Sequence, residues 1–255
     1  MLVDYHVHAV AHGEYGYSQD WANQFLDSAS RRGIQEIGFS EHDEFIHLVD
    51  FNTFQVVQNA RRHNIEIKLG IEMDYIPGQE QTINEIIRQK PYDYIIGSVH
   101  YIDGWGFDHP DFQGGFDERD IDDIYGQYAH ILMQMVQSGC FDVVGHIDLV
   151  KIWGHRPRRR SSLDYLDPVL EAVRKSNMAV EINSAGLRKK VAELYPEEAL
   201  VNRMFSYDIP ITFGSDAHHP DQIGEGLAEA YQSARKAGYR YLVRFNQHNK
   251  ITTAL

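Results

Sequence analysis

The sequence predicts an α/β fold in which parallel strands form the interior and helices lie outside them. Short apolar runs alternate with longer segments whose apolar residues recur at helical spacing, and this alternation repeats seven times in 255 residues. No G-x-G-x-x-G turn follows the first predicted strand, which disfavours an open, doubly wound sheet. No linker, repeat or low-complexity segment interrupts the chain. Residues 1–255 are therefore expected to form one domain, a closed or nearly closed barrel.

Seven segments are predicted to be strands because they are mostly apolar on both faces, as buried parallel strands are. They are Leu2–His6, Ile34–Phe39, Ile65–Ile71, Tyr92–Val99, Phe141–Gly145, Met178–Ile182 and Ile209–Phe213. Since none of these runs has a continuous polar face, neither side of the predicted sheet is expected to face solvent.

Six helices are predicted between the strands, because each segment carries an apolar stripe at helical period and then a stop signal. The first, for example, places Trp21, Phe25 and Ala29 on one face and stops at Gly33. The predicted helices are Asp20–Arg32, Glu80–Lys90, Asp117–Ser138, Leu163–Ser176, Pro196–Tyr207 and Gln222–Ala237.

The composition excludes several classes of protein. A formal net charge of −13 disfavours binding to nucleic acid or to anionic membranes, which requires a basic surface. No apolar stretch approaches the roughly 18 residues of a transmembrane helix, and no signal-peptide pattern follows Met1. A single cysteine excludes a disulfide framework and a thiolate metal cluster. We therefore expect a cytoplasmic protein with neither nucleic acid nor membrane as a partner; its oligomeric state has no signal in the sequence.

Histidine is abundant, with 14 residues, and half of these lie at or just after the ends of predicted strands. In a parallel barrel the carboxyl ends of all strands open on one face, where catalytic groups gather. With two carboxylates, these histidines give nine predicted metal ligands: His6, His8, His12, His42, Glu72, His100, His146, Asp216 and His218. Nine ligands exceed the roughly four to six that one ion takes, and are enough for two or three divalent ions of zinc, manganese or iron. The other seven histidines are expected to be ordinary polar residues.

The order of these groups resembles the PHP (polymerase and histidinol phosphatase) superfamily. The residues that carry the resemblance are His6-x-His8, His12, Glu41-His42-Asp43, Glu72, His100, His146 and Asp216-x-His218. Three further stretches resemble the histidinol-phosphate phosphatases of that superfamily: SVHYIDGWGFD at residues 98–108, DVVGHIDLV at 142–150 and EINSAGLRKK at 181–190. The resemblance implies a single-domain, distorted (β/α)7 TIM-like barrel with a site for three metal ions.

The resemblance also implies how the ligands divide among the three ions. One ion would be held by His6, His8, Glu72 and Asp216. A second would be held by Glu72, His100 and His146, with Glu72 as the bridge, and a third by His12, His42 and His218.

The activity that the resemblance implies is hydrolysis of a phosphate monoester, with L-histidinol phosphate giving L-histidinol and phosphate in histidine biosynthesis. The expected mechanism is in-line attack by a hydroxide that bridges two metal ions, without a covalent enzyme intermediate. Arginine suits phosphate because its planar guanidinium can donate two parallel hydrogen bonds. The substrate-binding candidates are Arg188, Arg160, Ser98 and Trp105, and the catalytic candidates are Asp43, Asp216 and His218.

Other activities are compatible with parts of this pattern. The PHP superfamily also includes phosphotyrosine phosphatases and nucleotide phosphodiesterases or exonucleases. An amidohydrolase would share His-x-His on the first strand, but it would use a modified lysine on a middle strand, where Glu72 and His100 stand here. A non-catalytic metal-binding PHP module would be expected to lack some ligands, and all nine are present.

Overall fold

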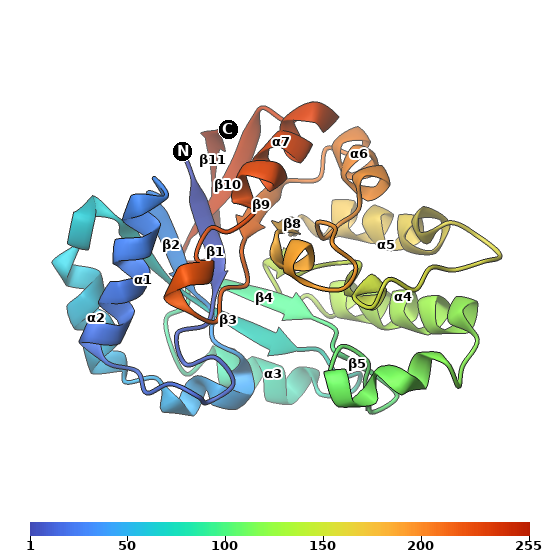
Figure 1. Ribbon diagram of the computed structural model, residues 1–255, viewed down its shortest axis with the longest axis horizontal. Coiled ribbons are helices and arrows are strands. Elements are labelled where there is room, and N and C mark those ends of the chain that lie inside the picture. Colours follow the sequence, from blue (N-terminus) through green and yellow to red (C-terminus); the bar gives the residue numbers. More distant parts are fainter.

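A curled, parallel sheet of seven strands forms the interior of the molecule (Figure 1). The computed structural model describes residues 1–255. The strands lie in the order β1-β2-β3-β4-β7-β8-β9, and every neighbouring pair is parallel. Their bounds are β1 Val3–Val7, β2 Glu36–Phe39, β3 Glu66–Asp74, β4 Tyr94–Ser98, β7 Val143–Val144, β8 Ala179–Asn183 and β9 Ile211–Gly214. The seven predicted strands are confirmed with small shifts at their ends, and so is the nearly closed barrel.

The barrel closes between its first and last strands only near their carboxyl ends. There the N–H of His8 donates to the carbonyl of Ala217 at 2.8 Å, and the N–H of Ala217 donates to the carbonyl of His6 at 3.2 Å. Below this point the buried carboxylate of Asp4 fills the seam and accepts hydrogen bonds from the backbone and hydroxyl of Ser215, at 2.8 and 2.5 Å. The seam is therefore held together next to the histidine cluster.

Seven α-helices cover the outside of the barrel. Figure 1 shows α1 and α2 on one side of the strands and α4 and α5 on the other. The helices are α1 Gln19–Arg31, α2 Phe51–Ala60, α3 Glu80–Ile87, α4 Ile121–Ser138, α5 Ser162–Ser176, α6 Glu198–Ser206 and α7 Leu227–Ala237. Six of them were predicted. The short helix α2 was not, because only Phe54 and Val57 of its ten residues are buried.

Two helices begin four or more residues later than predicted, for local reasons. Helix α4 begins four residues later because the side chain of Asp120 accepts hydrogen bonds from backbone N–H groups of its first turn. Helix α7 begins five residues later because Gly224 and Gly226 have φ values of +66° and +75°, which are not helical. The short 3₁₀ helices are Asp43–Leu48, Arg62–Asn64, Pro110–Phe116, Leu149–Lys151, Ala185–Arg188 and Pro220–Gln222.

A C-terminal hairpin closes the amino end of the barrel, and the sequence did not predict it. It consists of β10 (Tyr241–Asn246) and β11 (Asn249–Ala254), which pair in antiparallel fashion. The ring of Phe245 packs against those of Tyr5 and Tyr94, with centroids 5.8 and 5.6 Å apart. We call these three packed rings, Phe245, Tyr5 and Tyr94, the aromatic plug of the barrel. The histidine and carboxylate cluster lies at the opposite end of the barrel.

Two further strands, β5 (Tyr101–Ile102) and β6 (Trp105–Gly106), form a small antiparallel hairpin in the loop after β4. This loop leads directly away from His100 and therefore lies beside the carboxyl end of the barrel. None of the helices has the length and hydropathy that crossing a membrane requires.

Candidate metal centre

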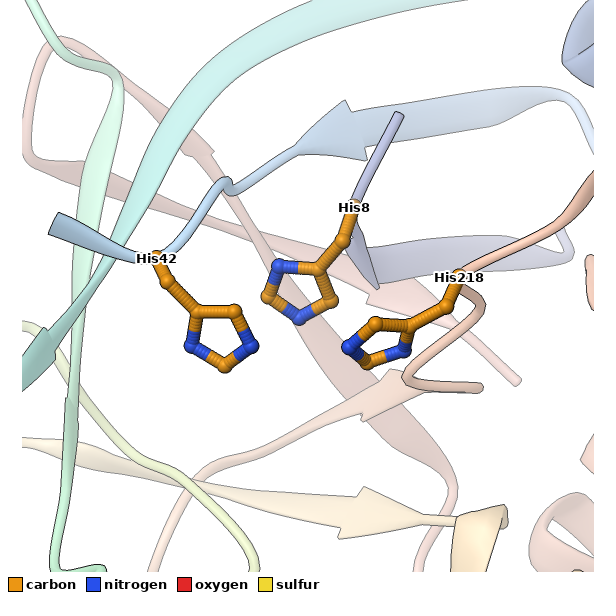
Figure 2. A group of neighbouring side chains, drawn as sticks. All are labelled: His8, His42 and His218. Carbon is orange, nitrogen blue, oxygen red and sulfur yellow. The ribbon is translucent and has the colours of Figure 1, made fainter. Parts of the chain in front are cut away.

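The predicted ligands come from the carboxyl ends of six different strands. His6 lies in β1 and His8 directly follows it, so the two side chains share one face of the strand. His42 follows β2, and its ring stacks on that of His8 with centroids 4.1 Å apart. His218 follows β9, and its ring lies 4.4 Å from that of His8. Figure 2 shows these last three rings turned toward one another from separate segments of the chain.

Glu72 is the centre of the cluster. It lies in β3, is buried, and has several histidine rings around its two oxygens. Its Oε2 is 2.9 Å from Nδ1 of His42, 3.1 Å from Nε2 of His6 and 3.5 Å from Nε2 of His8. Its Oε1 is 3.0 Å from Nε2 of His146. One carboxylate thus connects histidines from three other strand ends, which suits a bridging role.

Asp216 is a second carboxylate at the edge of the cluster. Its Oδ1 is 3.3 Å from Nε2 of His8, 3.5 Å from Nδ1 of His218 and 4.0 Å from Nε2 of His6. Its backbone has a φ of +53°, in the left-handed region that non-glycine residues seldom adopt. Strained backbone of this kind is common at functional sites, where the surrounding structure holds it in place.

Three groups of side chains could each hold an ion, because their ligand atoms lie within 4.8 Å of one another. They are His6, His8 and Asp216; His6, Glu72 and His146; and His8, His42 and His218. These groups overlap with the predicted sets but are not identical to them. His100 and His12 belong to none of the three groups. Nε2 of His100 lies 3.7 Å from Oε1 of Glu72. His12 is exposed, and the centroid of its ring lies 4.6 Å from that of His218. The assignment of ligands to particular ions stays a prediction.

Several buried atoms of the cluster lack hydrogen-bond partners, and this lack tests whether the residues fit a metal. The atoms without a partner include Nε2 of His6, His42 and His218, both ring nitrogens of His8, and Oε2 of Glu72. Leaving a buried polar atom unpaired costs about 1–3 kcal/mol, so several together require a compensating ligand. Imidazole nitrogens and carboxylate oxygens are ligands that divalent transition metals accept, and the residues therefore fit.

Burial and neighbouring charges set the protonation of the cluster. Burial lowers the pKa of His8 well below its usual value and that of His218 to about 4, so both rings are neutral at neutral pH. Burial alone would raise the pKa of Glu72 and Asp216, but the neighbouring histidines outweigh it and hold both pKa values well below the usual range. Burial alone would lower the pKa of His6, His42 and His100, but neighbouring carboxylates outweigh it and raise all three. Because metals bind neutral imidazoles and ionised carboxylates, binding at these rings would release protons.

Further side chains orient the predicted ligands. Ser98 is fully buried and donates a hydrogen bond to Oε1 of Glu72 at 2.6 Å, so it holds a ligand, and its predicted contact with substrate stays untested. Asp74 contacts Nδ1 of His100. Glu181 contacts Nδ1 of His6. Neither acid was among the predicted site residues, although the i, i+2 spacing of Asp74 from Glu72 on one strand is a signal in the sequence.

Arg188, the first of the predicted phosphate ligands, lies directly beside Asp216. Its Nη2 donates to the carbonyls of Ser215 and Asp216, at 2.7 and 3.1 Å. Its Nη1 is buried and has no hydrogen-bond partner. A fixed guanidinium with a free donor, directly beside a predicted metal ligand, is suited to an anionic substrate.

The other two substrate candidates lie in different surroundings. Arg160 is exposed, and its guanidinium lies 6.0 Å from the ring of Tyr165, beside a hollow on the outer surface. Trp105 packs against Phe116, with ring centroids 4.8 Å apart, and its Nε1 donates to the carbonyl of Phe112. Neither side chain contacts the metal cluster, and their contact with substrate stays a prediction.

Asp43 begins the 3₁₀ helix that follows His42 and is partly exposed at the rim of the cluster. Burial, helped by the nearby charge of Asp74, raises the pKa of Asp43 to about 6. A carboxyl group with this pKa can both hold and release a proton near neutral pH, so the prediction of Asp43 as a catalytic residue is chemically reasonable.

The fold and the site together define a class of protein: a (β/α) barrel whose strand ends carry a histidine and carboxylate metal centre. Residues 4–185 match the model of the PHP domain, and the chain belongs to the PHP domain family. The predicted family is thus confirmed.

The chain is similar to curated and solved members of this family. It is 34% identical to a "Probable histidinol-phosphatase" of Deinococcus radiodurans, over 94% of this chain and 95% of that protein. It is 25% identical to the histidinol-phosphatase of Lactococcus lactis, over 96% and 94% of the two chains. The crystal structure of histidinol phosphate phosphatase from Lactococcus lactis, complexed with zinc, L-histidinol and phosphate, matches with a TM-score of 0.78 and 22% identity, over 98% of each chain. This structural match confirms the barrel fold.

Proposed function

We propose that the protein is a metal-dependent phosphomonoesterase that hydrolyses L-histidinol phosphate to L-histidinol and phosphate. The observation that carries the proposal is the buried cluster of unpaired histidine nitrogens around Glu72 and Asp216. Full-length similarity to proteins named histidinol-phosphatase, and to a fold solved with zinc, L-histidinol and phosphate, supports the choice of substrate.

Two or three divalent ions of zinc, manganese or iron would be held by the nine predicted ligands. Glu72 is the best placed to bridge, because its two oxygens face different histidines. Bound ions would supply Lewis-acid polarisation and neutralise part of the charge on phosphate. Such positive charge is needed because the protein itself carries a formal net charge of −13.

The chain's own residues bind and orient the phosphate and move the proton. Arg188 would bind a phosphate oxygen through Nη1 while the carbonyls of Ser215 and Asp216 hold its other end. Asp43 would hold the proton that the leaving alcohol requires, since its raised pKa keeps a proton available near neutral pH. Asp216 and His218 are the other catalytic candidates, because both face the inside of the cluster.

We also propose that residues 1–255 form a single PHP domain. The family match covers residues 4–185, but β9, Asp216 and His218 lie beyond it and complete the sheet and the cluster. A cytoplasmic location agrees with the single cysteine, and the acidic composition agrees with a partner other than nucleic acid or an anionic membrane. The small phosphate monoester proposed as the partner follows from the metal site and the relatives.

Phosphate release from reconstituted protein tests the proposal. Metal-free protein is loaded with zinc, manganese or iron and assayed with L-histidinol phosphate, phosphotyrosine, p-nitrophenyl phosphate and a nucleotide diester. We expect L-histidinol phosphate to have the highest kcat/KM. Preference for phosphotyrosine or the diester would move the protein to another PHP activity; the chain is 19% identical to part of a DNA polymerase/3'-5' exonuclease of Bacillus subtilis. No hydrolysis with any metal would support a non-catalytic module.

A further inference from the structure

A buried acid stands behind His6 on the side away from the metal cluster. Glu181 lies in β8 and points into the barrel interior, where only 1% of its surface is exposed. Its Oε1 and Oε2 lie 3.0 and 2.9 Å from Nδ1 of His6. The opposite nitrogen of the same ring, Nε2, faces Glu72 and Asp216.

Asn183 fixes the orientation of that acid. Its Oδ1 accepts a hydrogen bond from the N–H of Ala185 at 2.8 Å, so its amide nitrogen must point the other way. That nitrogen, Nδ2, donates to Oε1 of Glu181 at 2.5 Å. Both oxygens of the acid are thus engaged: Oε1 by Asn183 and His6, and Oε2 by His6.

Backbone packing keeps the space for this carboxylate. A Cβ atom at Gly214, on the neighbouring strand β9, would lie 2.2 Å from Oε1 of Glu181. The same Cβ atom would also lie 2.4 Å from Cβ of His6, so glycine is required at this position. The absence of a side chain at Gly214 leaves room for Glu181 beside His6.

We propose that Glu181 is a positioning residue that keeps the proton of His6 on Nδ1, so that Nε2 presents its lone pair to a metal ion. The proposal rests on the metal-dependent function proposed above. A neutral imidazole carries one proton, and an acceptor at Nδ1 decides on which nitrogen it stays. The backbone N–H of Ala185 fixes the orientation of the Asn183 amide, and that amide fixes the Glu181 carboxylate. The carboxylate in turn fixes the orientation of the His6 ring.

Replacement of Glu181 by glutamine keeps the shape of the side chain but removes one of its two hydrogen-bond acceptors. Glutamine has one acceptor oxygen, and the fixed Asn183 donor requires it. The glutamine nitrogen would then take the place of Oε2, which lies 2.9 Å from Nδ1 of His6, and set a donor against that atom. This change favours the ring proton on Nε2, where it competes with a metal ion for the lone pair. The alternative orientation places two donor groups, of glutamine and Asn183, against each other.

Zinc titration of metal-free protein tests the role. In Glu181→Gln we expect the zinc affinity of the His6-containing site to fall about 10–100-fold, a range typical for residues that orient metal ligands. Two-bond ¹H–¹⁵N spectra of zinc-loaded, histidine-labelled protein should show His6 protonated on Nδ1 in the wild type and not in the variant. Glu36→Gln is the matched control, because Glu36 is equally buried but contacts Arg244 at the other end of the barrel.

Asn183→Asp is a second variant in case Glu181→Gln does not fold. Aspartate still accepts from the N–H of Ala185 but presents an acceptor to Glu181, so zinc affinity should again fall. Unchanged zinc affinity in a folded variant, within about twofold, together with an unchanged His6 spectrum, overturns the proposal. If the wild-type protein itself binds no zinc, manganese or iron, the proposed function fails instead, and the two failures are thus distinguishable.

Discussion

At the scale of single residues, the histidines differ in what lies around each ring. His6 and His100 have carboxylates behind Nδ1, whereas Nδ1 of His218 lies 3.1 Å from a backbone carbonyl. Outside the cluster, His63 and His248 pair with surface carboxylates, which agrees with the prediction that they are ordinary polar residues. The type of residue and its place at a strand end could be predicted from the sequence. For His6 and His100, the group that contacts Nδ1 could not be predicted, because it comes from a different strand.

The first prediction concerns His42, whose Nδ1 lies 2.9 Å from Glu72. In His42→Ala we expect loss of at least one bound ion per protein and a fall in kcat/KM of about a hundredfold or more, because a metal ligand is removed. Metal analysis of the purified variant, with phosphate release, measures both. His47→Ala is the control, since His47 is exposed on the 3₁₀ helix that follows His42 and its Nδ1 lies 2.9 Å from the carbonyl of Glu44. Full metal content in His42→Ala would show that this ring is not a ligand.

A second prediction separates phosphate binding from metal binding. Arg188→Ala removes the free Nη1 donor, so KM should rise by about 10–100-fold, since hydrogen bonds to charged groups contribute about 1.5–3 kcal/mol. Metal content should stay at the wild-type value. Arg160→Ala makes the comparison direct, because Arg160 lies on the outer surface beside Tyr165. A larger effect in Arg160→Ala than in Arg188→Ala would transfer the phosphate role to Arg160.

At the scale of elements, the sequence predicts well those strands that are buried on both faces and those helices that bury one apolar face. The seven core strands are buried on both faces and six helices carry clear apolar stripes, so period and composition identify them. The hairpin β10–β11 lacks such a pattern, because β11 is largely exposed and only Leu242, Val243 and Phe245 of β10 are buried. Its position depends on the open amino end of the barrel, which only the complete fold provides.

The third prediction tests the hairpin as a plug. Phe245 has no exposed surface and contacts Tyr5 and Tyr94, so Phe245→Ala should lower the free energy of unfolding by about 3–5 kcal/mol. Tyr241→Ala, at an exposed position of the same strand, should change it by less than about 0.5 kcal/mol. Denaturant unfolding monitored by circular dichroism measures both values. Equal effects of the two substitutions would show that the plug does not stabilise the barrel.

At the scale of the whole molecule, fold and site depend on each other. Six strand ends contribute ligands, so the cluster forms only when the barrel has closed, and the barrel closes through backbone hydrogen bonds between the ligand-bearing segments at His6, His8 and Ala217. Residue types and strand ends predicted which residues lie at this face, whereas their division among three ions was implied only by the family resemblance and stays a prediction. His8 belongs to two of the possible groups, and His12 to none, because the loop after β1 leaves His12 exposed. Such distances result from the packing of all strands at once.

This dependence predicts that metal ions stabilise the fold. An ion that binds the folded chain and not the unfolded chain adds about 2.7 kcal/mol when its concentration is a hundred times its Kd. The midpoint of thermal unfolding should therefore fall after chelation and rise again with added zinc, whereas Glu72→Gln, which loses the bridging carboxylate, should respond far less. Glu36→Gln should respond like the wild type, because Glu36 lies at the plugged end of the barrel. An unfolding midpoint that is independent of zinc in the wild-type protein would mean that the cluster does not bind this metal in the folded state.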